Sequence, residues 1–478
     1  MSITPDAAGT PAAATPAPTS GPPFDSLPLP PAALANLQRL GLLGMTPIQA
    51  ASLPLALAGR DLIAQAKTGS GKTVAFALPL LANLNPRRFA VQALVLCPTR
   101  ELAEQVTQEI RRLARAEDNI KTLTLCGGAT MRPQIASLEH GAHIVVGTPG
   151  RILDHLSRGT LALEALNTLV LDEADRMLDM GFAEDIASVI KHCPRQRQTL
   201  LFSATYPEGV AQLAARFMRE PEEVTLAERH AASKIRQRFY EVKEGERLHA
   251  VGLLLKHYRP VSTLAFCNTK QQCRDLVAVL QAEGIVALEL HGDLDQRERD
   301  QVLVQFANRS CSVLVATDVA ARGLDIAHLE AVINVDITPE VELHTHRVGR
   351  TGRADEAGWA FSFASMDEMG RVGRIDEMQG SASVWHALSE LTVPADAPPL
   401  RPPMVTLQIL GGRKEKIRPG DVLGALTKDL GFDAAQIGKI NVNEFSTYVA
   451  VDRAIADKAL RALNAGRVKG KSVKVRRL

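Results

Sequence analysis

The sequence lacks long apolar runs, and its first part lacks positive charge. No run of about 18 uncharged apolar residues, the minimum for a membrane span, occurs in the chain. The first 38 residues contain neither Lys nor Arg, whereas a secretory signal begins with basic residues. We therefore expect neither kind of segment, and a cytoplasmic protein is the simplest interpretation.

Cysteine is scarce and scattered. No two of the six cysteines form the Cys-x-x-Cys pair that many zinc and redox sites contain. Several lie in apolar runs, where Cys serves as a small hydrophobic residue, and we expect this role for all of them. They are Cys97, Cys126, Cys193, Cys267, Cys273 and Cys311.

The formal net charge of +2 hides an asymmetry along the chain. Residues 404–478 contain 15 Lys and Arg against 7 Asp and Glu, whereas the rest of the chain contains 40 against 46. A basic module attached to a slightly acidic one usually indicates a nucleic-acid partner, although a merely solvated basic surface is the alternative.

Short runs rich in Val, Leu and Ile alternate with helical stretches from Asp61 onward, which is typical of a parallel sheet covered by helices. The pattern pauses at a charged stretch near residues 228–247 and then resumes. We therefore expect two similar α/β domains, over residues 23–222 and 223–385. Their strands are expected at residues 62–65, 93–96, 121–125, 143–146, 168–171 and 199–202, and then at 263–266, 286–290, 312–316, 331–335 and 360–363.

Three further segments complete the predicted organisation. Residues 1–22 are mostly Ala, Pro, Thr and Gly, which offer too little apolar surface for folding, so we expect a disordered tail. Residues 386–403 are expected to form a linker. Residues 404–478 alternate strands near 405–409, 437–442, 448–451 and 473–476 with helices near 421–430 and 453–463, the β-α-β-β-α-β order of an RRM-like fold.

A glycine-rich loop follows the first predicted strand. It reads Ala66-Lys67-Thr68-Gly69-Ser70-Gly71-Lys72-Thr73 and leads into an apolar helical stretch. In that context the glycines let backbone N–H groups surround phosphates, Lys72 reaches the β- and γ-phosphates, and Thr73 holds Mg²⁺. Ala66 stands where the general pattern has Gly. A purely structural turn is the alternative.

An acidic element ends a later strand. Residues 169–171 run into Asp172-Glu173-Ala174-Asp175. Asp172 would bind Mg²⁺ through water, and Glu173 would orient and deprotonate the attacking water, so the two motifs together predict an ATPase. An acidic helix N-cap is the alternative.

These two motifs occur with others in an order that resembles the DEAD-box RNA helicases over residues 23–370. The further motifs are Pro98-Thr99-Arg100-Glu101-Leu102-Ala103, Thr148-Pro149-Gly150-Arg151, Ser203-Ala204-Thr205, Ala316-Thr317-Asp318-Val319-Ala320-Ala321-Arg322-Gly323-Leu324-Asp325 and His346-Arg347-Val348-Gly349-Arg350-Thr351-Gly352-Arg353. The resemblance implies an ATP-dependent RNA helicase of the α/β class, with two tandem RecA-like parallel-sheet domains plus the C-terminal RRM-like α+β domain.

The resemblance also implies roles at the nucleotide. Gln49 reads the adenine edge and Phe24 stacks near the base, although a helix N-cap at Thr46 that Gln49 completes is the alternative. Arg350 and Arg353 match the family's arginine fingers, which are worth on the order of 10³ to 10⁵ in rate. Hydrolysis should therefore require closure of the two domains.

Further positions of the resemblance connect the nucleotide to RNA. Asp325 meets the ribose and favours the closed state. Ser203 and Thr205, hydrogen-bonded near Asp175, couple the phosphate site to the opposite face, and His346 belongs to the same coupling set.

On that opposite face, family members hold one RNA strand by its sugar-phosphate backbone, which positions RNA without reading its sequence. Closure on ATP would bend this strand and separate its partner locally. For each single residue a solvated surface role is the alternative. The matching positions here are Arg100, Gly128, Thr148, Arg151, Thr269, Thr317 and Arg322.

Residues 411–426 resemble the RNA-binding domain of DbpA-type helicases, which act on large-subunit ribosomal RNA during ribosome assembly. The strands of this domain offer Tyr448 and little else for stacking on bases, so we expect basic residues to carry the binding. A folding or dimerisation module with a basic surface is the alternative. The basic residues are Arg413, Lys414, Lys416, Arg418, Lys469, Lys471, Lys474, Arg476 and Arg477.

We therefore expect a monomeric, cytoplasmic, RNA-stimulated ATPase that uses ATP and Mg²⁺ and unwinds RNA locally. The C-terminal domain would target it to rRNA in the pre-ribosomal large subunit, and no membrane is a partner. An ATP-dependent RNA clamp or remodelling factor with little unwinding is the alternative. DNA helicases and P-loop transporters share the phosphate chemistry, but the Asp-Glu-Ala-Asp element and Gln49 argue against both, and the transporter signature Leu-Ser-Gly-Gly-Gln is absent.

Overall fold

The structure is a computed structural model of the chain. It describes residues 21–66, 69–225, 235–243, 245–321, 329–352, 358–394 and 396–478. The chain divides into two units, residues 1–229 and 230–478. Five of the predicted site residues lie outside the described residues, namely Lys67, Thr68, Arg322, Asp325 and Arg353, as does the predicted tail up to residue 20.

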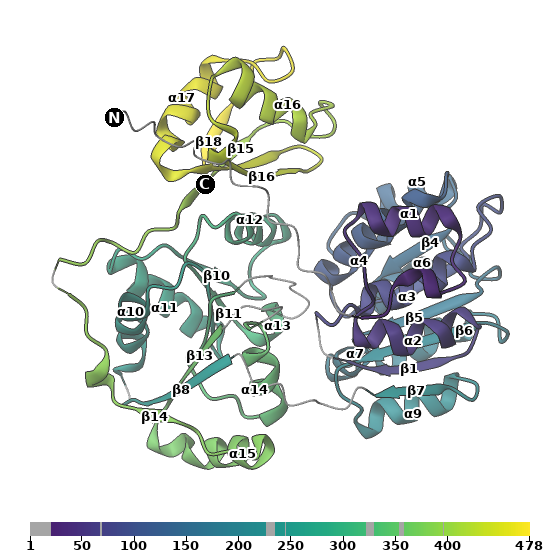
Figure 1. Ribbon diagram of the computed structural model, residues 1–478, viewed down its shortest axis with the longest axis horizontal. Helices are drawn as coiled ribbons and strands as arrows, with labels where there is room; N and C mark the ends of the chain where they lie inside the picture. Colours follow the sequence, from purple (N-terminus) through teal and green to yellow (C-terminus); the bar gives the residue numbers. More distant parts are fainter. Residues whose placement is uncertain are drawn as a thin grey trace, which may run out of the picture. The chain divides into compact units, whose positions relative to one another are not determined.

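The first unit contains a seven-stranded parallel sheet, in the order β3-β4-β2-β5-β6-β1-β7 (Figure 1). Because all neighbouring strands run parallel, their carboxyl ends lie at one edge of the sheet. The strands are β1 (Leu62–Gln65), β2 (Ala93–Leu96), β3 (Thr122–Leu125), β4 (Ile144–Gly147), β5 (Thr168–Asp172), β6 (Gln198–Ser203) and β7 (Glu222–Thr225).

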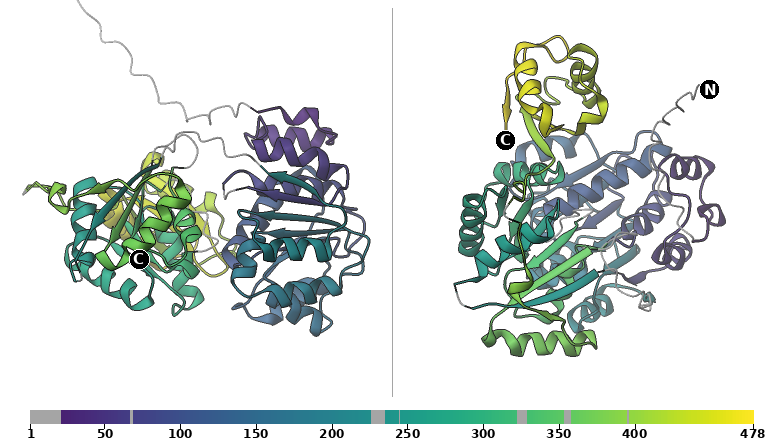
Figure 2. Two further views of the ribbon diagram at one scale, coloured as in Figure 1. Left: turned by 90° about the horizontal axis from the view of Figure 1, so that it is seen from below. Right: turned by 60° about the vertical axis from the view of Figure 1, so that its left-hand side comes forward.

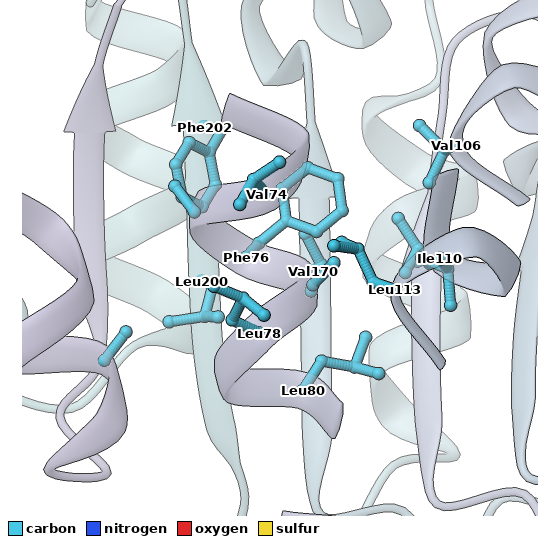
Figure 3. Close-up of a cluster of buried hydrophobic side chains, with 14 of the residues drawn as sticks. Val74, Phe76, Leu78, Leu80, Val106, Ile110, Leu113, Val170, Leu200 and Phe202 are labelled. Carbon is cyan, nitrogen blue, oxygen red and sulfur yellow. The ribbon is translucent and has the colours of Figure 1, made fainter. Parts of the chain in front are cut away.

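Helices cover both faces of this sheet, as two further views show (Figure 2). Alternate strand residues enter different cores: Val95 packs with helices α2 to α4, and Leu94 packs with α6 to α9. Figure 3 shows Phe76 of α3 and Phe202 of β6 in the first core, and their ring centroids are 5.4 Å apart. The helices are α1 (Pro31–Arg39), α2 (Pro47–Leu57), α3 (Lys72–Ala82), α4 (Arg100–Leu113), α5 (Met131–Glu139), α6 (Pro149–Ser157), α7 (Ala174–Asp179), α8 (Ala183–Lys191) and α9 (Glu208–Phe217), with 3-10 turns η1 (Phe24–Ser26) and η2 (Ala114–Ala116).

The second unit begins with another seven-stranded parallel sheet, in the order β10-β11-β9-β12-β13-β8-β14. Its strands are β8 (Ile235–Glu241), β9 (Thr263–Phe266), β10 (Ala287–Leu290), β11 (Val313–Ala316), β12 (Ala331–Asn334), β13 (Gly358–Ala364) and β14 (Trp385–His386). Its helices are α10 (Arg247–Tyr258), α11 (Lys270–Ala282), α12 (Gln296–Ala307), α13 (Asp318–Ala321), α14 (Val341–Val348) and α15 (Met369–Gln379), with 3-10 turns η3 (Met366–Glu368) and η4 (Leu388–Glu390). The two sheets are the tandem RecA-like domains that were predicted.

The second unit ends in a small antiparallel sheet, in the order β16-β17-β15-β18. Leu407 and Val449 of its two central strands pack against helices α16 and α17. Its elements are β15 (Met404–Ile409), α16 (Pro419–Gly424), a π-helical turn η5 (Ala425–Asp429), η6 (Ala434–Gln436), β16 (Ile437–Val442), β17 (Thr447–Asp452), η7 (Arg453–Ile455), α17 (Ala456–Ala465) and β18 (Val475–Arg477). The RRM-like order is confirmed.

The other face of the small sheet is largely closed. Thr406 is buried, and its Oγ1 lies 3.1 Å from Asn308 Nδ2 and 2.6 Å from Ser310 Oγ, both of which follow α12. Farther along β15, Gln408 Nε2 donates to the Tyr448 hydroxyl at 3.3 Å. A face that carries buried polar side chains in contact with protein is not an open RNA platform.

The sequence analysis missed three strands, and two of them, β7 and β14, change the predicted segment boundaries. β7 pairs with β1, so the first sheet extends beyond residue 222 to Thr225. β14 pairs with β8 through His386, so the predicted linker begins too early. β8 lies in the stretch that was called charged: the guanidinium groups of Arg236 and Arg238 each lie 5.3 Å from the Trp359 ring centroid, which makes a charged strand compatible with the sheet.

Within the described ranges, no helix combines the length and the apolar character that crossing a bilayer requires.

Candidate functional site

The carboxyl edge of the first sheet divides into two halves. β5, β6 and β1 are neighbours, and these strands end in or are followed by the predicted nucleotide residues 66–73 and 172–173 and by the predicted coupling residues Ser203 and Thr205. β3, β4 and β2 are neighbours on the other side, and the predicted RNA residues of this unit follow them. Ligands of open parallel sheets bind outside the carboxyl ends of the strands. The strand order therefore provides two adjoining surfaces, which meet between β2 and β5.

The glycine-rich loop ends at the start of α3. Gly71 is the N-cap of this helix with φ +93°, a conformation that glycine adopts readily. A Cβ atom at Gly71 would lie 2.5 Å from Gln49 Nε2 and 2.9 Å from Thr46 Oγ1, so no side chain fits there. The loop thus presents a helix N-terminus, where N–H groups and the helix dipole attract phosphate.

Gln49 joins α2 to this loop. Its Oε1 accepts a hydrogen bond from the Thr46 N–H at 2.9 Å, and its Nε2 donates to the Gly71 carbonyl at 3.0 Å. The first bond is half of the helix cap considered as the alternative, whereas the buried Thr46 Oγ1 has no hydrogen-bond partner among the described residues. The adenine contact of Gln49 stays a prediction.

Two buried charges lie at the start of α3 and the end of β5. Lys72 Nζ and Asp172 Oδ1 make no hydrogen bond to any residue that the structure describes. Burial raises the pKa of Asp172 from 3.8 to about 7, while Lys72 opposes and Glu173 reinforces this shift. An ammonium and a carboxylate without partners fit a site for a phosphate and a cation, because Mg²⁺ is commonly held by one or two carboxylates plus substrate phosphates. No cluster of three or more metal-binding His, Cys, Asp or Glu side chains occurs in the described ranges.

Glu173 is held by a neighbour that the sequence analysis did not consider. Its backbone has φ +54°, which is strained for a residue other than glycine. Its Oε2 lies 2.6 Å from Arg176 Nη1, and both side chains are mostly buried. The i,i+3 spacing at the start of α7 was the available signal for this pair. The ion pair fixes the orientation of the Glu173 carboxylate, and its action on the attacking water stays a prediction.

Asp175 connects β5 to β6. Its Oδ2 accepts hydrogen bonds from the Thr205 N–H at 2.9 Å and from the Thr205 hydroxyl at 2.8 Å, and its own N–H donates to Ser203 Oγ at 3.2 Å. Burial raises the pKa of Asp175, but the bonds from Thr205 and Ser203 outweigh burial and leave the pKa below its ordinary value. The predicted contact is present, and the coupling role stays a prediction.

The other half of this edge holds its arginines in fixed positions. Gly128 has φ +72°, and a Cβ atom there would collide with the Arg100 guanidinium, so Arg100 lies directly on the Gly128 backbone. Arg151 Nη1 donates to the Ala129 carbonyl at 3.1 Å. Thr148 is the N-cap of α6. The structure thus brings together all four RNA residues predicted in this unit.

In the second parallel-sheet domain, a buried arginine of α14 joins residues that follow three of the strands. Arg347 Nε and Nη2 lie 2.7 and 2.6 Å from the two carboxylate oxygens of Asp318, and its remaining N–H groups donate to the Asn268 side chain and the Asp336 carbonyl. Arg347 is only 1% exposed. Arg350 follows on the same chain segment, and its N–H donates to the Arg347 carbonyl. The sequence analysis quoted Arg347 and Asp318 within motifs but assigned them no role.

The remaining predicted residues of this unit follow neighbouring strands. Thr269 follows β9 and caps α11, where its Oγ1 accepts from the Gln272 N–H at 3.2 Å. Thr317 follows β11, the neighbour of β9 in the sheet. His346 is half-buried in α14.

The nine basic residues predicted in the C-terminal domain are all exposed. Lys469 Nζ donates to the Lys416 carbonyl and lies 3.5 Å from Asp421 Oδ2. The loop at 411–418 and the turn at 466–471 therefore lie side by side. We call their combined positive charge the basic surface, which consists of Arg413, Lys414, Lys416, Lys469 and Lys471.

Two further predictions concern buried side chains. Phe24 is only 4% exposed and packs in the first core, and its stacking near the base stays a prediction. All six cysteines are free and buried, as expected of small hydrophobic residues. Burial raises the pKa of Cys126 and of Cys311 to about 12, which keeps these thiols protonated.

Models of three known families match the chain in succession. They are the DEAD/DEAH box helicase at residues 46–213, the helicase conserved C-terminal domain at 246–355 and the DbpA RNA binding domain at 406–477. The matches correspond to the two parallel sheets and the small antiparallel sheet.

Individual relatives agree with these matches. The chain is 53% identical to the ATP-dependent RNA helicase DbpA of Escherichia coli K12, over 94% of this chain and 98% of that protein. It is 44% identical to the DEAD-box ATP-dependent RNA helicase CshA of Geobacillus kaustophilus, over 74% and 76%. Among solved structures, Saccharomyces cerevisiae Dbp5 bound to RNA and ADP BeF3 is similar with a TM-score of 0.70 and 30% identity, over 77% of this chain and 96% of that one.

Asp172→Asn should raise the thermal stability of the protein measured without nucleotide or Mg²⁺. The folded-state pKa of about 7 lies above the ordinary 3.8, so the folded chain binds this proton more tightly than the unfolded chain does. The proton on Asp172 therefore contributes to the free energy of unfolding. This contribution is complete below pH 3.8 and is lost as the pH rises through about 7. At pH 8 the cost of the charge is at most about 4 kcal/mol, because each pKa unit is worth about 1.4 kcal/mol.

Thermal unfolding at pH 5.5 and pH 8 measures this effect, and the gain in Tm should be larger at pH 8. Asp61→Asn is the matched control, since the buried Asp61 carboxylate accepts N–H bonds from Thr199 and Arg219 and its replacement should lower Tm. An Asp172→Asn protein that melts below the native protein at pH 8 would contradict the assignment.

Proposed function

The chain belongs to the DEAD-box ATP-dependent RNA helicases that carry a DbpA RNA-binding domain, and on that premise we propose that it unwinds short RNA duplexes locally by closing its two RecA-like domains around ATP. Members of this family are RNA-stimulated ATPases, so the reaction is hydrolysis of ATP to ADP and phosphate. The observation that carries the proposal is that the buried Lys72 Nζ and Asp172 Oδ1 have no hydrogen-bond partner among the described residues, because buried polar atoms of this kind are stabilised by a ligand.

The first domain would hold the triphosphate. Lys72 lies at the N-terminus of α3 and would take the β- and γ-phosphates, while Gly71 lets the backbone approach them. Thr73 and Asp172 would hold Mg²⁺, which when bound neutralises charge that develops on the phosphate oxygens. Glu173 would orient the attacking water and accept its proton, with Arg176 fixing the carboxylate beforehand.

The second domain would supply the missing positive charge. Arg350 and Arg353 are offered as arginine fingers, and Asp325 as the ribose contact that favours the closed state. The Arg347–Asp318 pair would keep the Arg350 segment fixed on its sheet, because removing one partner of a buried ion pair costs about 3–5 kcal/mol of stability. Closure thus completes the site only when both domains meet the same nucleotide.

RNA would bind along the other half of each sheet edge. Arg100 and Arg151 would contact phosphates of one strand, and Thr269, Thr317 and Arg322 would continue the contact on the second domain. Asp175 follows β5, the strand next to the RNA half of the first edge, and its bonds to Ser203 and Thr205 would transmit closure from nucleotide to RNA. A strand that is bent on closure cannot remain in a regular duplex, so its partner separates locally.

The C-terminal domain would direct this activity to large-subunit rRNA during ribosome assembly in the cytoplasm, with the protein acting as a monomer. Support comes from the basic surface and from the DbpA RNA binding domain match at residues 406–477. An ATP-dependent clamp or remodelling factor with little unwinding uses the same site, and duplex-separation assays distinguish it from a helicase.

RNA stimulation of ATP hydrolysis should vanish in Arg353→Ala and in Arg350→Ala, while nucleotide binding survives. The reason is that these residues contribute charge to the transition state and not to ground-state binding, at about 10³-fold or more in kcat. Steady-state ATPase rates with and without RNA measure the first effect, and binding of a fluorescent ADP analogue measures the second. RNA-stimulated turnover equal to that of the native protein would rule out domain closure as the activating step.

Targeting should depend on the basic surface. Replacing Lys416, Lys469 and Lys471 by Ala should weaken binding of a large-subunit rRNA fragment and lower the slope of log affinity against log salt by about one unit per contact. The control replaces Lys428, Lys439 and Arg461 of the same domain, which removes equal charge elsewhere. ATPase activation by the rRNA fragment and by unrelated RNA is then compared. If the native chain responds equally to both RNAs, the targeting role is wrong.

A further inference from the structure

The C-terminal domain has a single strongly exposed aromatic side chain. Across residues 404–478, which are all described, the aromatic residues are Phe432, Phe445 and Tyr448. Phe432 and Tyr448 are 7% and 4% exposed, whereas Phe445 is 59% exposed. A ring left largely in water adds little to folding, so the stability of the domain does not account for Phe445.

The sheet face on which RRM-like domains stack bases does not offer a ring here. The hydroxyl of the buried Tyr448 accepts from Gln408 Nε2, and Gln408 Oε1 accepts from Arg476 Nε at 2.6 Å. Gln408 and Ala450 on this face are also buried. A base that stacks on this domain must therefore use a different surface.

Phe445 is presented by a turn that is fixed before any ligand binds. The turn closes through Asn443 N–H to the Ser446 carbonyl at 2.8 Å. The neighbouring loop adds two bonds, from the Arg413 N–H to the Asn443 carbonyl at 2.8 Å and from the Lys414 N–H to the Glu444 carbonyl at 3.0 Å. Stacking on Phe445 therefore requires little further ordering of the protein, which favours affinity.

The loop needs a glycine to reach this turn. A Cβ atom at Gly412 would lie 2.3 Å from the Asn443 carbonyl oxygen, so the two backbones touch. The Thr447 hydroxyl donates to the Gly411 carbonyl at 2.8 Å on the other side of the same loop. The contact joins the turn that carries Phe445 to the loop that carries three residues of the basic surface.

Positive charge lies over one face of the ring. Lys414 Nζ is 4.2 Å from the Phe445 ring centroid and 3.2 Å from Glu444 Oε1. The basic surface continues from Lys414 through Lys416 to Lys469, whose Nζ donates to the Lys416 carbonyl. An exposed ring with one cation over a face and the basic surface nearby matches a nucleotide, because a base can stack on the ring and its phosphates offer negative charge.

We infer that Phe445 is a stacking platform for an unpaired base of a structured RNA, and that Lys414 and the rest of the basic surface hold the adjacent phosphates. The inference rests on the proposed RNA-binding function of the C-terminal domain and adds a preference to it. Phosphate contacts alone would bind any duplex, whereas stacking on a ring requires a base that is not paired with another base. The domain therefore selects a loop or bulge over a blunt duplex.

The test uses the full chain and an RNA hairpin with 2-aminopurine in its unpaired loop. Phe445→Ala and Phe445→Leu should weaken hairpin binding by about 5- to 150-fold, the equivalent of about 1–3 kcal/mol for one stacked base, and should abolish quenching of the fluorophore. Phe445→Trp should retain both. Binding of a blunt duplex of equal charge, the salt slope and the thermal unfolding temperature should not change. Leu410→Ala is the control for an exposed apolar side chain at the same end of the sheet, since Leu410 is 48% exposed.

Two results separate failure of this inference from failure of the proposed function. If Phe445→Ala binds and quenches the hairpin like the native protein while the Lys416, Lys469 and Lys471 triple replacement weakens binding, the stacking platform is wrong and RNA binding by the domain stands. If the triple replacement also has no effect, the proposed function of the domain fails. If Phe445→Ala changes only the oligomeric state in sedimentation, the ring is a protein contact and the inference is overturned.

Discussion

The parallel order of the strands in the first sheet is the constraint on which both binding surfaces depend. It places β5, β6 and β1 together and β3, β4 and β2 together, with every carboxyl end at one edge. The phosphate loop and the acidic residues then meet without any long-range adjustment, and the Arg100 and Arg151 loops meet beside them. Asp175 lies in α7, just after β5, and accepts a hydrogen bond from Thr205, which follows β6. The residues predicted for nucleotide and those predicted for RNA are thus neighbours at one edge of the sheet.

Buried charge has two different meanings in this chain. Arg347 and Asp318 form a forked ion pair that satisfies both groups, which fixes a segment of the second sheet. Lys72 and Asp172 are just as deeply buried but leave atoms without a hydrogen-bond partner among the described residues, and burial raises the pKa of Asp172 to about 7. The first arrangement stabilises the fold, whereas the second costs stability and is expected where a ligand completes the site.

Local patterns predicted the nucleotide residues and the strands that carry them, because short apolar runs followed by Gly-rich or acidic loops have few other interpretations. The same patterns failed for β8, whose arginines lie over Trp359, a partner more than a hundred residues away. They also gave no role to Arg347, since an arginine within a helix looks the same in sequence whether it is buried or exposed. Phe445 was missed for the related reason that exposure depends on how a turn is anchored. The formation of β8, the burial of Arg347 and the exposure of Phe445 all depend on contacts with residues that are distant in sequence.

The most direct test of the account measures how strongly bound RNA changes the affinity of the protein for nucleotide. The affinity of a non-hydrolysable ATP analogue is determined with and without saturating single-stranded RNA, in the native protein and in the Ser203→Ala, Thr205→Val double variant. The account predicts that RNA tightens nucleotide binding of the native protein by about 5- to 150-fold, and that the variant loses this effect while binding each ligand alone normally. Coupling of native strength in the variant would contradict it.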